Sequence, residues 1–514
     1  MRISPWIMCF VAAAQAADYT GPLRPQVHFS PPVNFMNDPN GLFYDDRSGT
    51  YHLYYQYNPS EPVAGNQHWG HATSPDLYHW TNQPIAISPS ESDEYIFSGS
   101  AVVDADNTSG FFPDQEDGVV AIYTVDAPDK ETQHIAYSTD GGYTFTKYAD
   151  NPVIDSTSKD FRDPQVTWHH GTQRWVMVIA YAADRVIGFY TSSNLREWEH
   201  ASNFTQAGLP GVEFECPNLV EFPVNQALAH KGKKHVLFIS VNPGAPLGGS
   251  GTFYVVGDFN GTHFESETPH APLYDFAKDN YAAQWFSGIP AGQPPVSIGW
   301  ASNWDYTEEV PTGKREGWRS AATLPRTHTL TQVDGSWVVT HSPADGLAPV
   351  RGAQLGSWDL QSGDNGTTVD FSHVSSKAVY LEVAIEEINP LSPVGEVVFR
   401  ISSSTSGESL DGGLRLNQNR FWISRAGTHL FTSQDNGNYT SEFHTAVSVE
   451  TSSFRFSAVV DHSVFEVFVE DGSRSGTMSF FPTSPLDILD VSARGLEAGS
   501  RVSVDVWGLR GVWE

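Results

Sequence analysis

A weak internal repeat is the feature that most constrains the fold of this chain. Four segments, which start at residues 74, 138, 192 and 257, each combine a small residue, a polar turn and a closing aromatic residue. The starts are 64, 54 and 65 residues apart, which suits a four-stranded sheet with its loops. Radial repetition of sheets is how a β-propeller avoids exposed strand edges, so we predict about five units between residues 27 and 340. A run of ordinary hairpins in a sandwich is the alternative.

The composition favours β structure throughout. The chain has 44 Gly and 33 Pro, and scarcely any stretch of helical length repeats its apolar residues every 3.6 positions. Short aromatic and β-branched runs predict strands instead. In the first part of the chain these runs are Tyr51–Tyr57, Val119–Tyr123, Trp175–Tyr181, His235–Val241 and Val296–Trp300.

The pattern changes after residue 326. The Gly- and Pro-containing segment 342–356 is typical of a linker. Beyond it, four runs alternate like the strands of an antiparallel sandwich: Tyr380–Ile385, Glu396–Ile401, Phe454–Val460 and Val464–Val469. The sequence therefore predicts an all-β protein, with a five-bladed β-propeller over residues 17–341 followed by a C-terminal β-sandwich over residues 357–514.

Residues 1–16 have the organisation of a secretory signal peptide. Arg2 supplies the positive start, Ile7–Ala14 the apolar core and Ala14-Gln15-Ala16 the small-residue cleavage site. No later stretch approaches the roughly 18 consecutive apolar residues of a transmembrane helix. We therefore expect a secreted, extracellular protein that is not a membrane protein. Five Asn-X-Ser/Thr sequons are candidate glycosylation sites: Asn107, Asn203, Asn260, Asn365 and Asn438.

The net charge and the cysteine content exclude some classes of partner and an intramolecular disulfide. The net charge of −31 and the pI near 4.8 argue against nucleic acid and anionic membranes as partners, because both would be repelled. Of the two cysteines, Cys9 is lost with the signal peptide and only Cys216 is left, so no intramolecular disulfide can form. The excess of acidic over basic residues suits a protein with an acidic exterior and a neutral substrate.

Three carboxylates lie in stiff local sequences. Asp38, Asp163 and Glu215 each come shortly after an aromatic residue and are followed within two positions by a proline, which restricts the backbone. Each lies 29 to 42 residues before the repeat segment of its own unit. All three should therefore fall on the innermost strands of different blades, around the central channel, where such a cluster makes a pocket for a small polar molecule. For Asp38 the plain alternative is a hairpin tip at Asn40-Gly41.

These acids suit sugar hydrolysis better than metal binding. His68-Trp-Gly-His71 lacks the companion ligands of a zinc site, and Arg162 would compete with a cation for Asp163. Two carboxylates that flank a glycosidic bond are the common apparatus of glycosidases. Arg162 should hold Asp163 ionised, whereas Glu215, in a site that is already negative, should carry a proton. We expect no metal and no cofactor.

Five motifs in the same order resemble glycoside hydrolase family 32, the family of invertases, inulinases, levanases and fructosyltransferases. They are Asn37-Asp38-Pro39-Asn40-Gly41, the segment Trp69–Trp80, Phe97-Ser98-Gly99-Ser100, Arg162-Asp163-Pro164 and Glu215-Cys216-Pro217. Asp461–Phe468 is also similar to the sandwich signature of the family. The resemblance covers nearly the whole mature chain. It implies a five-bladed propeller with a β-sandwich and retaining attack on β-fructosides such as sucrose, fructo-oligosaccharides or fructans.

The resemblance also implies roles for individual residues. Asp38 matches the nucleophile, Glu215 the acid/base and Asp163 the stabiliser of the transition state. Five positions match residues that line the fructose pocket: Asn37, Gln56, Phe97, Ser98 and Arg162. Asp275 and Lys278 resemble the acid and its neighbour on the acceptor side of the pocket.

One departure from the family pattern concerns Ala64. The family usually has a tryptophan in this position, so an aromatic wall of the pocket is missing. We hypothesise that Trp69 or Trp304 moves toward the gap, or that the gap admits an acceptor sugar and favours transfructosylation. A dedicated fructosyltransferase and an exo-acting levanase or inulinase are alternatives within the family. A family 43-like arabinosidase, a non-catalytic sugar-binding module and a purely structural propeller are the rivals outside it.

Overall fold

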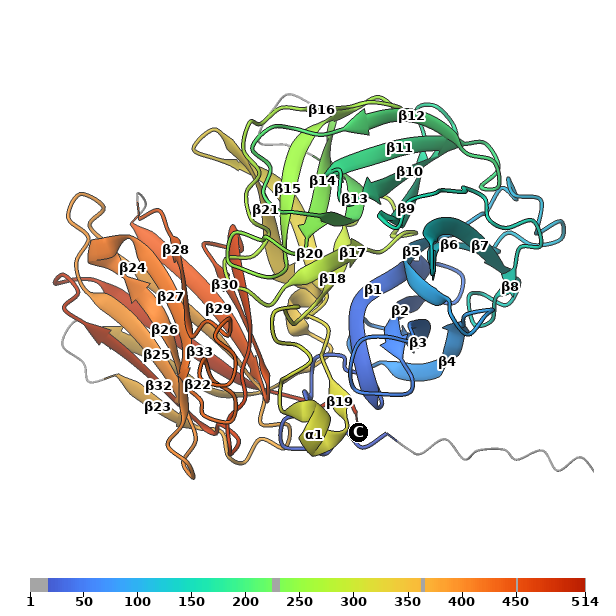
Figure 1. Cartoon of the computed structure of the whole chain (residues 1–514). Coiled ribbons are helices and arrows are strands. Elements are labelled where there is room, and N and C mark those ends of the chain that lie inside the picture. Colours follow the sequence, from blue (N-terminus) through green and yellow to red (C-terminus); the bar gives the residue numbers. More distant parts are fainter. Residues whose placement is uncertain (1–16, 224–231, 362–365, 450–451, 514) are drawn as a thin grey trace, which may run out of the picture.

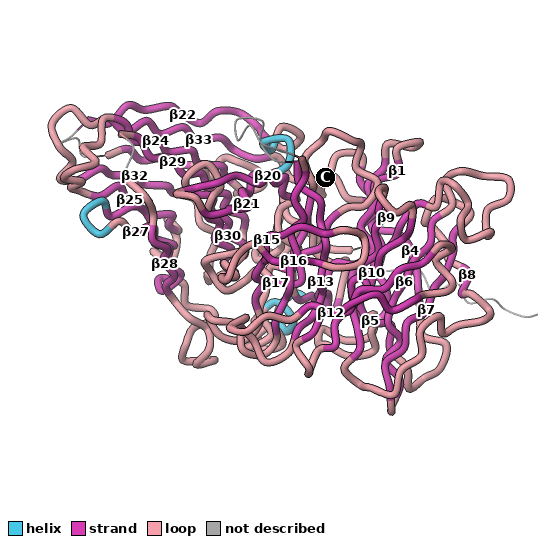
Figure 2. Tube along the Cα trace, turned by 90° about the horizontal axis from the view of Figure 1, so that it is seen from above, coloured by secondary structure: helices cyan, strands magenta, loops and turns pink. Residues whose placement is uncertain are grey.

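The structure, a computed structural model, describes residues 17–223, 232–361, 366–449 and 452–513. Two all-β domains lie side by side, the N-terminal one a ring of sheets and the C-terminal one a pair of stacked sheets (Figure 1, Figure 2). The predicted fold class is confirmed. The predicted signal peptide, residues 1–16, and the sequon at Asn365 lie outside the described residues.

The N-terminal domain is built from five sheets. The first three contain β1 (Asn34–Asp45), β2 (Thr50–Asn58), β3 (His68–Ser74) and β4 (Thr81–Ile87); β5 (Tyr95–Val103), β6 (Val119–Ala127), β7 (Lys130–Ser138) and β8 (Thr146–Lys147); and β9 (Phe161–His169), β10 (Arg174–Tyr181), β11 (Val186–Ser192) and β12 (Glu199–Phe204). The last two contain β13 (Phe214–Pro223), β14 (Lys233–Val241), β15 (Gly251–Phe259) and β16 (Phe264–Ser266); and β17 (Tyr281–Trp285), β18 (Val296–Trp300), β20 (Arg326–Val333) and β21 (Ser336–Pro343).

The ring closes through its innermost strands. β1, β5, β9, β13 and β17 contact one another in this order, and β17 contacts β1 again. A short strand, β19 (Trp318–Arg319), adds to the first sheet by parallel pairing with β1. It follows the five-residue helix α1 (Thr312–Glu316), and no described helix is long and apolar enough to cross a membrane.

The repeat seen in the sequence marks the outer turn of the first four blades, between the third and fourth strands. In each turn one Asp or Asn side chain accepts hydrogen bonds from two backbone N–H groups at 2.9–3.1 Å, two to four residues further on. These residues are Asp76, Asp140, Asn194 and Asn260. Such Asx turns explain why the repeat combines a polar turn with a closing aromatic residue four or five positions later.

The five innermost strands share a second feature that the sequence did not show. Each contains a β-bulge in which two residues face one residue of the neighbouring strand. The bulged pairs are 37–38, 97–98, 163–164, 216–217 and 282–283. One member of three pairs has positive φ, Asp163 at 66°, Cys216 at 44° and Ala282 at 50°. Because a bulge redirects side chains, it can turn residues of an inner strand toward the channel, and three of the five pairs supply residues that line a cavity there.

The C-terminal domain is a sandwich of two six-stranded sheets. One contains β22 (Arg351–Gln361), β33 (Arg501–Leu509), β24 (Val379–Glu386), β29 (Ser453–Asp461), β30 (Val464–Val469) and β31 (Arg474–Ser479). The other contains β23 (Thr367–Asp370), β32 (Ile488–Arg494), β25 (Glu396–Ser402), β26 (Ser409–Arg415), β27 (Arg420–Gly427) and β28 (Glu442–Ala446). Apolar residues that alternate along these strands meet in one core between the sheets.

The nine predicted strands all coincide with strands of the structure. The segment 342–356, which we expected to be a linker, is mostly ordered secondary structure. β21 runs to Pro343, a 3-10 turn occupies Ala344–Leu347, and β22 begins at Arg351. The connection between the last propeller strand and the first sandwich strand is therefore short.

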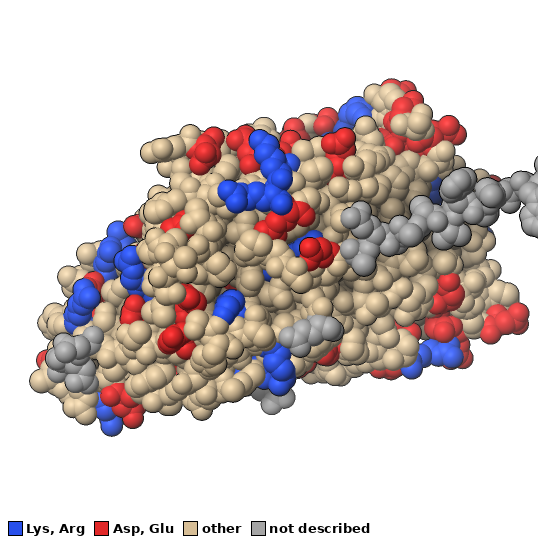
Figure 3. Space-filling model, turned by 90° about the horizontal axis from the view of Figure 1, so that it is seen from below, with Lys and Arg blue, Asp and Glu red and all other residues tan. Residues whose placement is uncertain are grey.

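The N-terminal segment before β1 fastens the two domains together. The backbone N–H groups of Gln26, Val27 and His28 all donate to the Asp461 carboxylate of the sandwich, at 2.7–3.1 Å. The adjacent sandwich residue Glu466 accepts from Arg326 Nη2 at 2.6 Å. On the face in Figure 3, acidic and basic side chains of the described residues are interspersed and form no continuous basic surface.

Candidate active site

A cavity of about 260 Å³ lies among the innermost strands of the propeller. Asp38, Asp163 and Glu215 line it from β1, β9 and β13, so the predicted placement of these acids on inner strands of three blades is confirmed. The other residues that line the cavity are Asn37, Gln56, Gln67, Phe97, Ser98, Arg162, Asn242 and Trp304. The bulges supply Asn37, Asp38, Phe97, Ser98 and Asp163.

Cys216 links two of the acids. Its backbone N–H donates to Asp163 Oδ2 at 2.9 Å, and its Sγ lies 3.5 Å from Asp38 Oδ2 and 3.6 Å from Asp163 Oδ2. Burial and the three nearby carboxylates raise the pKa of the Cys216 thiol, which keeps it a donor. The cysteine thus contacts Asp38 and Asp163, although it is next to Glu215 in the sequence.

Glu215 is held by two donors. Arg162 Nη1 donates to Glu215 Oε1 at 3.0 Å, and the Tyr281 hydroxyl donates to Glu215 Oε2. Arg162 Nε also contacts both oxygens of Glu131 at 3.1 Å. We expected Arg162 to hold its neighbour Asp163 ionised, but its hydrogen bonds reach Glu131 and Glu215 in the two neighbouring blades.

The electrostatics of the site favour retention of protons. Burial, followed by the charges of Glu215 and Asp163, raises the pKa of Asp38 to about 8. Burial and Glu215 also raise the pKa of Asp163 to about 6, against the opposing effect of the Arg162 charge. The charge of Arg162 does lower the pKa of Asp163, as expected for a residue that favours the ionised form, but burial and Glu215 outweigh it. Because the carboxylates interact, their protons belong to the group rather than to one residue.

Trp304 forms the aromatic wall of the cavity beside Ala64. Its ring centroid lies 4.9 Å from that of Trp300 and 6.1 Å from that of Phe35, and Ala64 packs against the same cluster. Trp69 is fully buried, and its Nε1 donates to the Phe97 carbonyl at 3.0 Å. Of the two tryptophans that could compensate for Ala64, Trp304 is the one that lines the cavity.

Asp275 and Lys278 do not line the cavity. Asp275 is buried at the domain junction, where it accepts from Thr477 N and Thr477 Oγ1, both at 2.8 Å. Lys278 Nζ donates to Asp305 Oδ2 at 2.7 Å, and its side chain is 2% exposed. The segment before β17 faces the sandwich, and for this reason the structure does not bring these two residues together with the acids.

Several residues of the site were missed in the sequence. Gln67 and Asn242 line the cavity, and Tyr281 and Glu131 contact Glu215 and Arg162. Asn242 stands before Pro243, which repeats the polar-residue and proline pattern of the acids and could have been noticed. Glu131 lies within an ordinary strand and has no local signal.

No group of three or more His, Cys, Asp or Glu residues in the described part of the chain is arranged to hold a metal ion. The propeller, the sandwich and the carboxylate-lined cavity together define a class of protein, the hydrolases that cleave bonds between sugars with paired carboxylates. The chain belongs to glycoside hydrolase family 32. The N-terminal domain of that family matches residues 28–341, and its C-terminal domain matches residues 350–508.

Individual relatives agree with this assignment. The chain is 37% identical to invertase 2 of Saccharomyces cerevisiae over 487 residues, and this alignment covers 90% of each chain. It is 37% identical over 486 residues to the extracellular exo-inulinase of Meyerozyma guilliermondii, over 91% of this chain and 92% of the relative. The solved structure of the fructofuranosidase from Schwanniomyces occidentalis complexed with fructose superposes with a TM-score of 0.88 at 34% identity, covering 96% of this chain and 100% of that one.

Proposed function

We propose that this protein is a secreted, retaining β-fructofuranosidase that acts on sucrose, fructo-oligosaccharides or β-fructans. The observation that carries the proposal is the convergence of Asp38 and Glu215 on one small cavity, with donors on Glu215 and an unpartnered oxygen on Asp38. Asp38 Oδ1 has no hydrogen-bond partner among the described residues. A buried acceptor without a partner is costly unless a substrate atom meets it.

In the first step the Asp38 carboxylate attacks the anomeric carbon of the fructosyl unit. The bond to the leaving sugar breaks as the ester to Asp38 forms, and Glu215 gives its proton to the leaving oxygen. This step needs one proton on the pair, carried by Glu215. The raised pKa of Asp38 supports a pair that retains one proton near neutrality, and that proton must move to Glu215 when substrate binds.

In the second step water attacks the same carbon from the side that the leaving sugar vacated. Glu215, now a carboxylate, accepts a proton from the water, and the bond to Asp38 breaks to release fructose with retained configuration. Arg162 and Tyr281 keep the Glu215 carboxyl oriented in both steps. The Asp163 carboxylate can accept hydrogen bonds from fructose hydroxyls, and the amides of Asn37 and Gln56 can accept hydrogen bonds from them or donate to them.

An acceptor sugar in place of water would give transfer. We propose that the small side chain of Ala64 leaves room for such an acceptor beside Trp304, so that fructo-oligosaccharides form from concentrated sucrose. Positioning of the acceptor decides this competition. The proposal of secretion is supported by the signal sequence at residues 1–16 and by the name of the extracellular relative.

The test is product analysis with the full chain. We expect free fructose from sucrose, inulin or levan, together with oligosaccharides at high sucrose concentration. Release of arabinose from arabinan without release of fructose would favour the family 43-like alternative. Binding of fructose without any cleavage would favour a sugar-binding module.

A further inference from the structure

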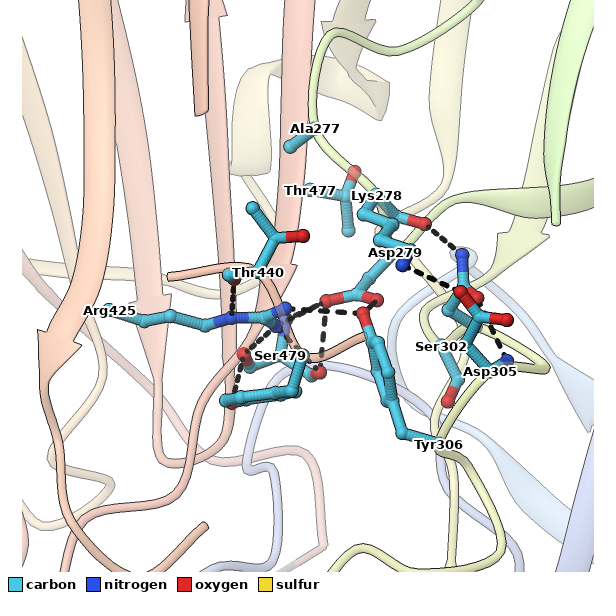
Figure 4. A network of polar contacts seen from close by, with 12 residues as sticks. Ala277, Lys278, Asp279, Ser302, Asp305, Tyr306, Arg425, Thr440, Thr477 and Ser479 are labelled. Atoms are coloured by element: carbon cyan, nitrogen blue, oxygen red, sulfur yellow. Dashed lines mark hydrogen bonds and ion pairs between the residues drawn. The ribbon is translucent and has the colours of Figure 1, made fainter. Parts of the chain in front are cut away.

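The loop that carries Trp304 is fastened from the sandwich domain. The side chain Nδ2 of Asn436, between β27 and β28, donates to the backbone carbonyl of Asp305 at 2.9 Å. Lys278 Nζ connects Asp305 Oδ2, at 2.7 Å, to the backbone carbonyl of Asn438 in the sandwich, at 2.8 Å. The close view in Figure 4 shows Lys278 and Asp305 joined in this way at the domain junction.

A second set of contacts holds the next residue of the loop. The Tyr306 hydroxyl donates to Asp279 Oδ1, and Arg425 of the sandwich donates to Asp279 Oδ2 at 2.7 Å and to the Tyr306 hydroxyl oxygen at 3.2 Å (Figure 4). The ring of Tyr306 packs edge-on against that of Tyr439 at 5.0 Å. The backbone on the C-terminal side of Trp304 is therefore held from two sides, by the sandwich and by Asn303 of the propeller, whose Oδ1 accepts from Asp305 N at 3.0 Å.

The ring of Trp304 itself is held less firmly. It is half-buried and rests on Trp300 and Phe35, while one side faces the cavity. The backbone N–H of Trp304 donates to Ser250 Oγ at 3.1 Å. A shift of the loop backbone would therefore move the aromatic wall against which a sugar packs, without disturbing the three acids.

We propose that Asn436 is a positioning residue for sugar recognition, which acts through Asp305 to hold Trp304 at the edge of the cavity. The sandwich domain thereby contributes to substrate specificity without lining the cavity. This inference rests on the proposed function and deepens it. Asn436 is suited to the role because its Oδ1 also accepts from Asn438 N at 2.9 Å. This hydrogen bond fixes the turn in which the backbone carbonyl of Asn438 faces Lys278.

The chain offers a matched control. Asn389, in another sandwich loop, is also half-buried and forms the same kind of turn, since its Oδ1 accepts from Leu391 N at 3.1 Å. Among the described residues, the hydrogen bonds of Asn389 go to Leu391 and Ser392 of its own loop and none goes to the propeller. Asn389→Ala therefore removes an equivalent turn without affecting the Trp304 loop.

The experiment compares Asn436→Ala, Asn436→Asp and Asn389→Ala in the full chain. Asn436→Asp keeps the acceptor of the turn but replaces the donor to Asp305 with a carboxylate oxygen, which also adds a negative charge, whereas Asn436→Ala removes the donor without adding charge. We expect both Asn436 variants to raise KM for sucrose about fivefold, the scale of one lost hydrogen bond, with kcat changed by less than about twofold. In a Trp304→Ala background, Asn436→Asp should give no further rise in KM. Asn389→Ala should leave KM unchanged.

A readout that does not need turnover accompanies the kinetics. Hydrogen exchange at the backbone of residues 300–310 should become faster in Asn436→Asp and stay unchanged in Asn389→Ala. Unchanged KM and unchanged exchange in Asn436→Asp, or an equal rise in KM with and without Trp304, would overturn the positioning role. Faster exchange in an enzyme that releases no fructose would instead refute the proposed function and leave the contact between the domains established.

Discussion

Two sets of buried carboxylates in this molecule have opposite electrostatics. Asp38 and Asp163 in the cavity are 7% and 5% exposed, and the pKa values of both are raised by burial and by the charge of Glu215. Asp461 and Glu466 at the domain junction are fully buried, yet their pKa values lie below the ordinary range. Burial opposes this, but the hydrogen bonds and charges of His28 and Arg326 outweigh it.

The difference lies in the donors around each set. Asp461 accepts from three backbone N–H groups and from His28 Nδ1, whereas Asp38 has one oxygen without a partner among the described residues. Burial alone therefore does not distinguish a reactive acid from a structural one. A reactive acid is a buried one that the fold leaves incompletely paired.

The largest expected effect is on turnover by Asp38→Asn. Loss of the nucleophile should reduce kcat by at least about 1,000-fold. The thermal unfolding midpoint should stay the same or rise, because one of several repelling carboxylates is removed. Steady-state rates and calorimetry on the same preparation check both parts. Retention of most of the activity, or an inverted product anomer, would show that the assignment of the nucleophile is wrong.

An Asp→Asn substitution at the domain junction should instead reduce stability far more than activity. Asp461→Asn removes one of the two counter-ions of the buried His28, leaving only Glu466, and should lower the free energy of unfolding by about 3–5 kcal/mol. The activity of each folded molecule should fall far less than in Asp38→Asn. Urea unfolding followed by fluorescence measures the change, and the exposed Glu386→Gln serves as the control. A change of less than about 1 kcal/mol would mean that the junction acid behaves like a surface acid.

His28 should make stability fall in alkaline solution. Burial alone would lower the pKa of His28, but the hydrogen bonds and charges of Asp461 and Glu466 raise it from 6.5 to about 9. Since the folded state binds this proton more tightly than the unfolded chain, the stabilisation is fully present below pH 6.5 and is lost as the pH rises through about 9. The loss should be on the order of 3 kcal/mol, measured as the urea unfolding free energy at pH 6 and pH 9.5. A curve that is flat over this interval in the native protein would argue against a charged His28.

The acids of the cavity should give a bell-shaped dependence of activity on pH. Activity needs one proton and one negative charge on the Asp38 and Glu215 pair, so the optimum should lie on the acid side of neutrality. The rate should decline as the pH approaches 8, the value to which burial, Glu215 and Asp163 raise the pKa of Asp38. Initial rates with sucrose in a series of buffers of equal ionic strength measure the profile. A rate that rises steadily to pH 8 would contradict this pairing of roles.

The smallest expected effect concerns the pocket edge. Ala64→Trp should fill the space beside Trp304 and shift products toward hydrolysis by about fivefold, the scale of a contact worth about 1 kcal/mol. Chromatography of the products from concentrated sucrose measures the ratio of oligosaccharide to free fructose. An unchanged ratio would identify Ala64 as a substitution that Trp304 compensates by packing alone.

The sequence predicted the inner-strand acids because proline marks them. Pro164 and Pro217 lie within bulged pairs and Pro39 directly follows one, since proline cannot donate to the strand ladder. The bulges at 97–98 and 282–283 contain no proline and were not visible. Their register depends on closure of the ring, which no local pattern encodes.

The prediction that Asp275 and Lys278 lie at the pocket differs from the structure for a similar reason. Their local sequence matches the family, but which domain a loop faces is decided by the packing of the sandwich. The partners of Lys278 include Asn438, 160 residues away. Likewise, Glu131 reaches the site because its strand, β7, lies beside the segment that precedes Arg162.

The anchor of the N-terminal segment on Asp461 has a consequence for biosynthesis. The strand that carries Asp38 is made first, but its upstream segment binds a carboxylate that the ribosome adds 433 to 435 residues later. Contacts of such long range form late, after earlier domains have begun to fold. A nascent chain that stops before β29 therefore has a complete set of blades, while residues 26–28 upstream of β1 still lack their partner. The sandwich thus completes the attachment of a ring whose last strand, β21, ends 118 residues before Asp461.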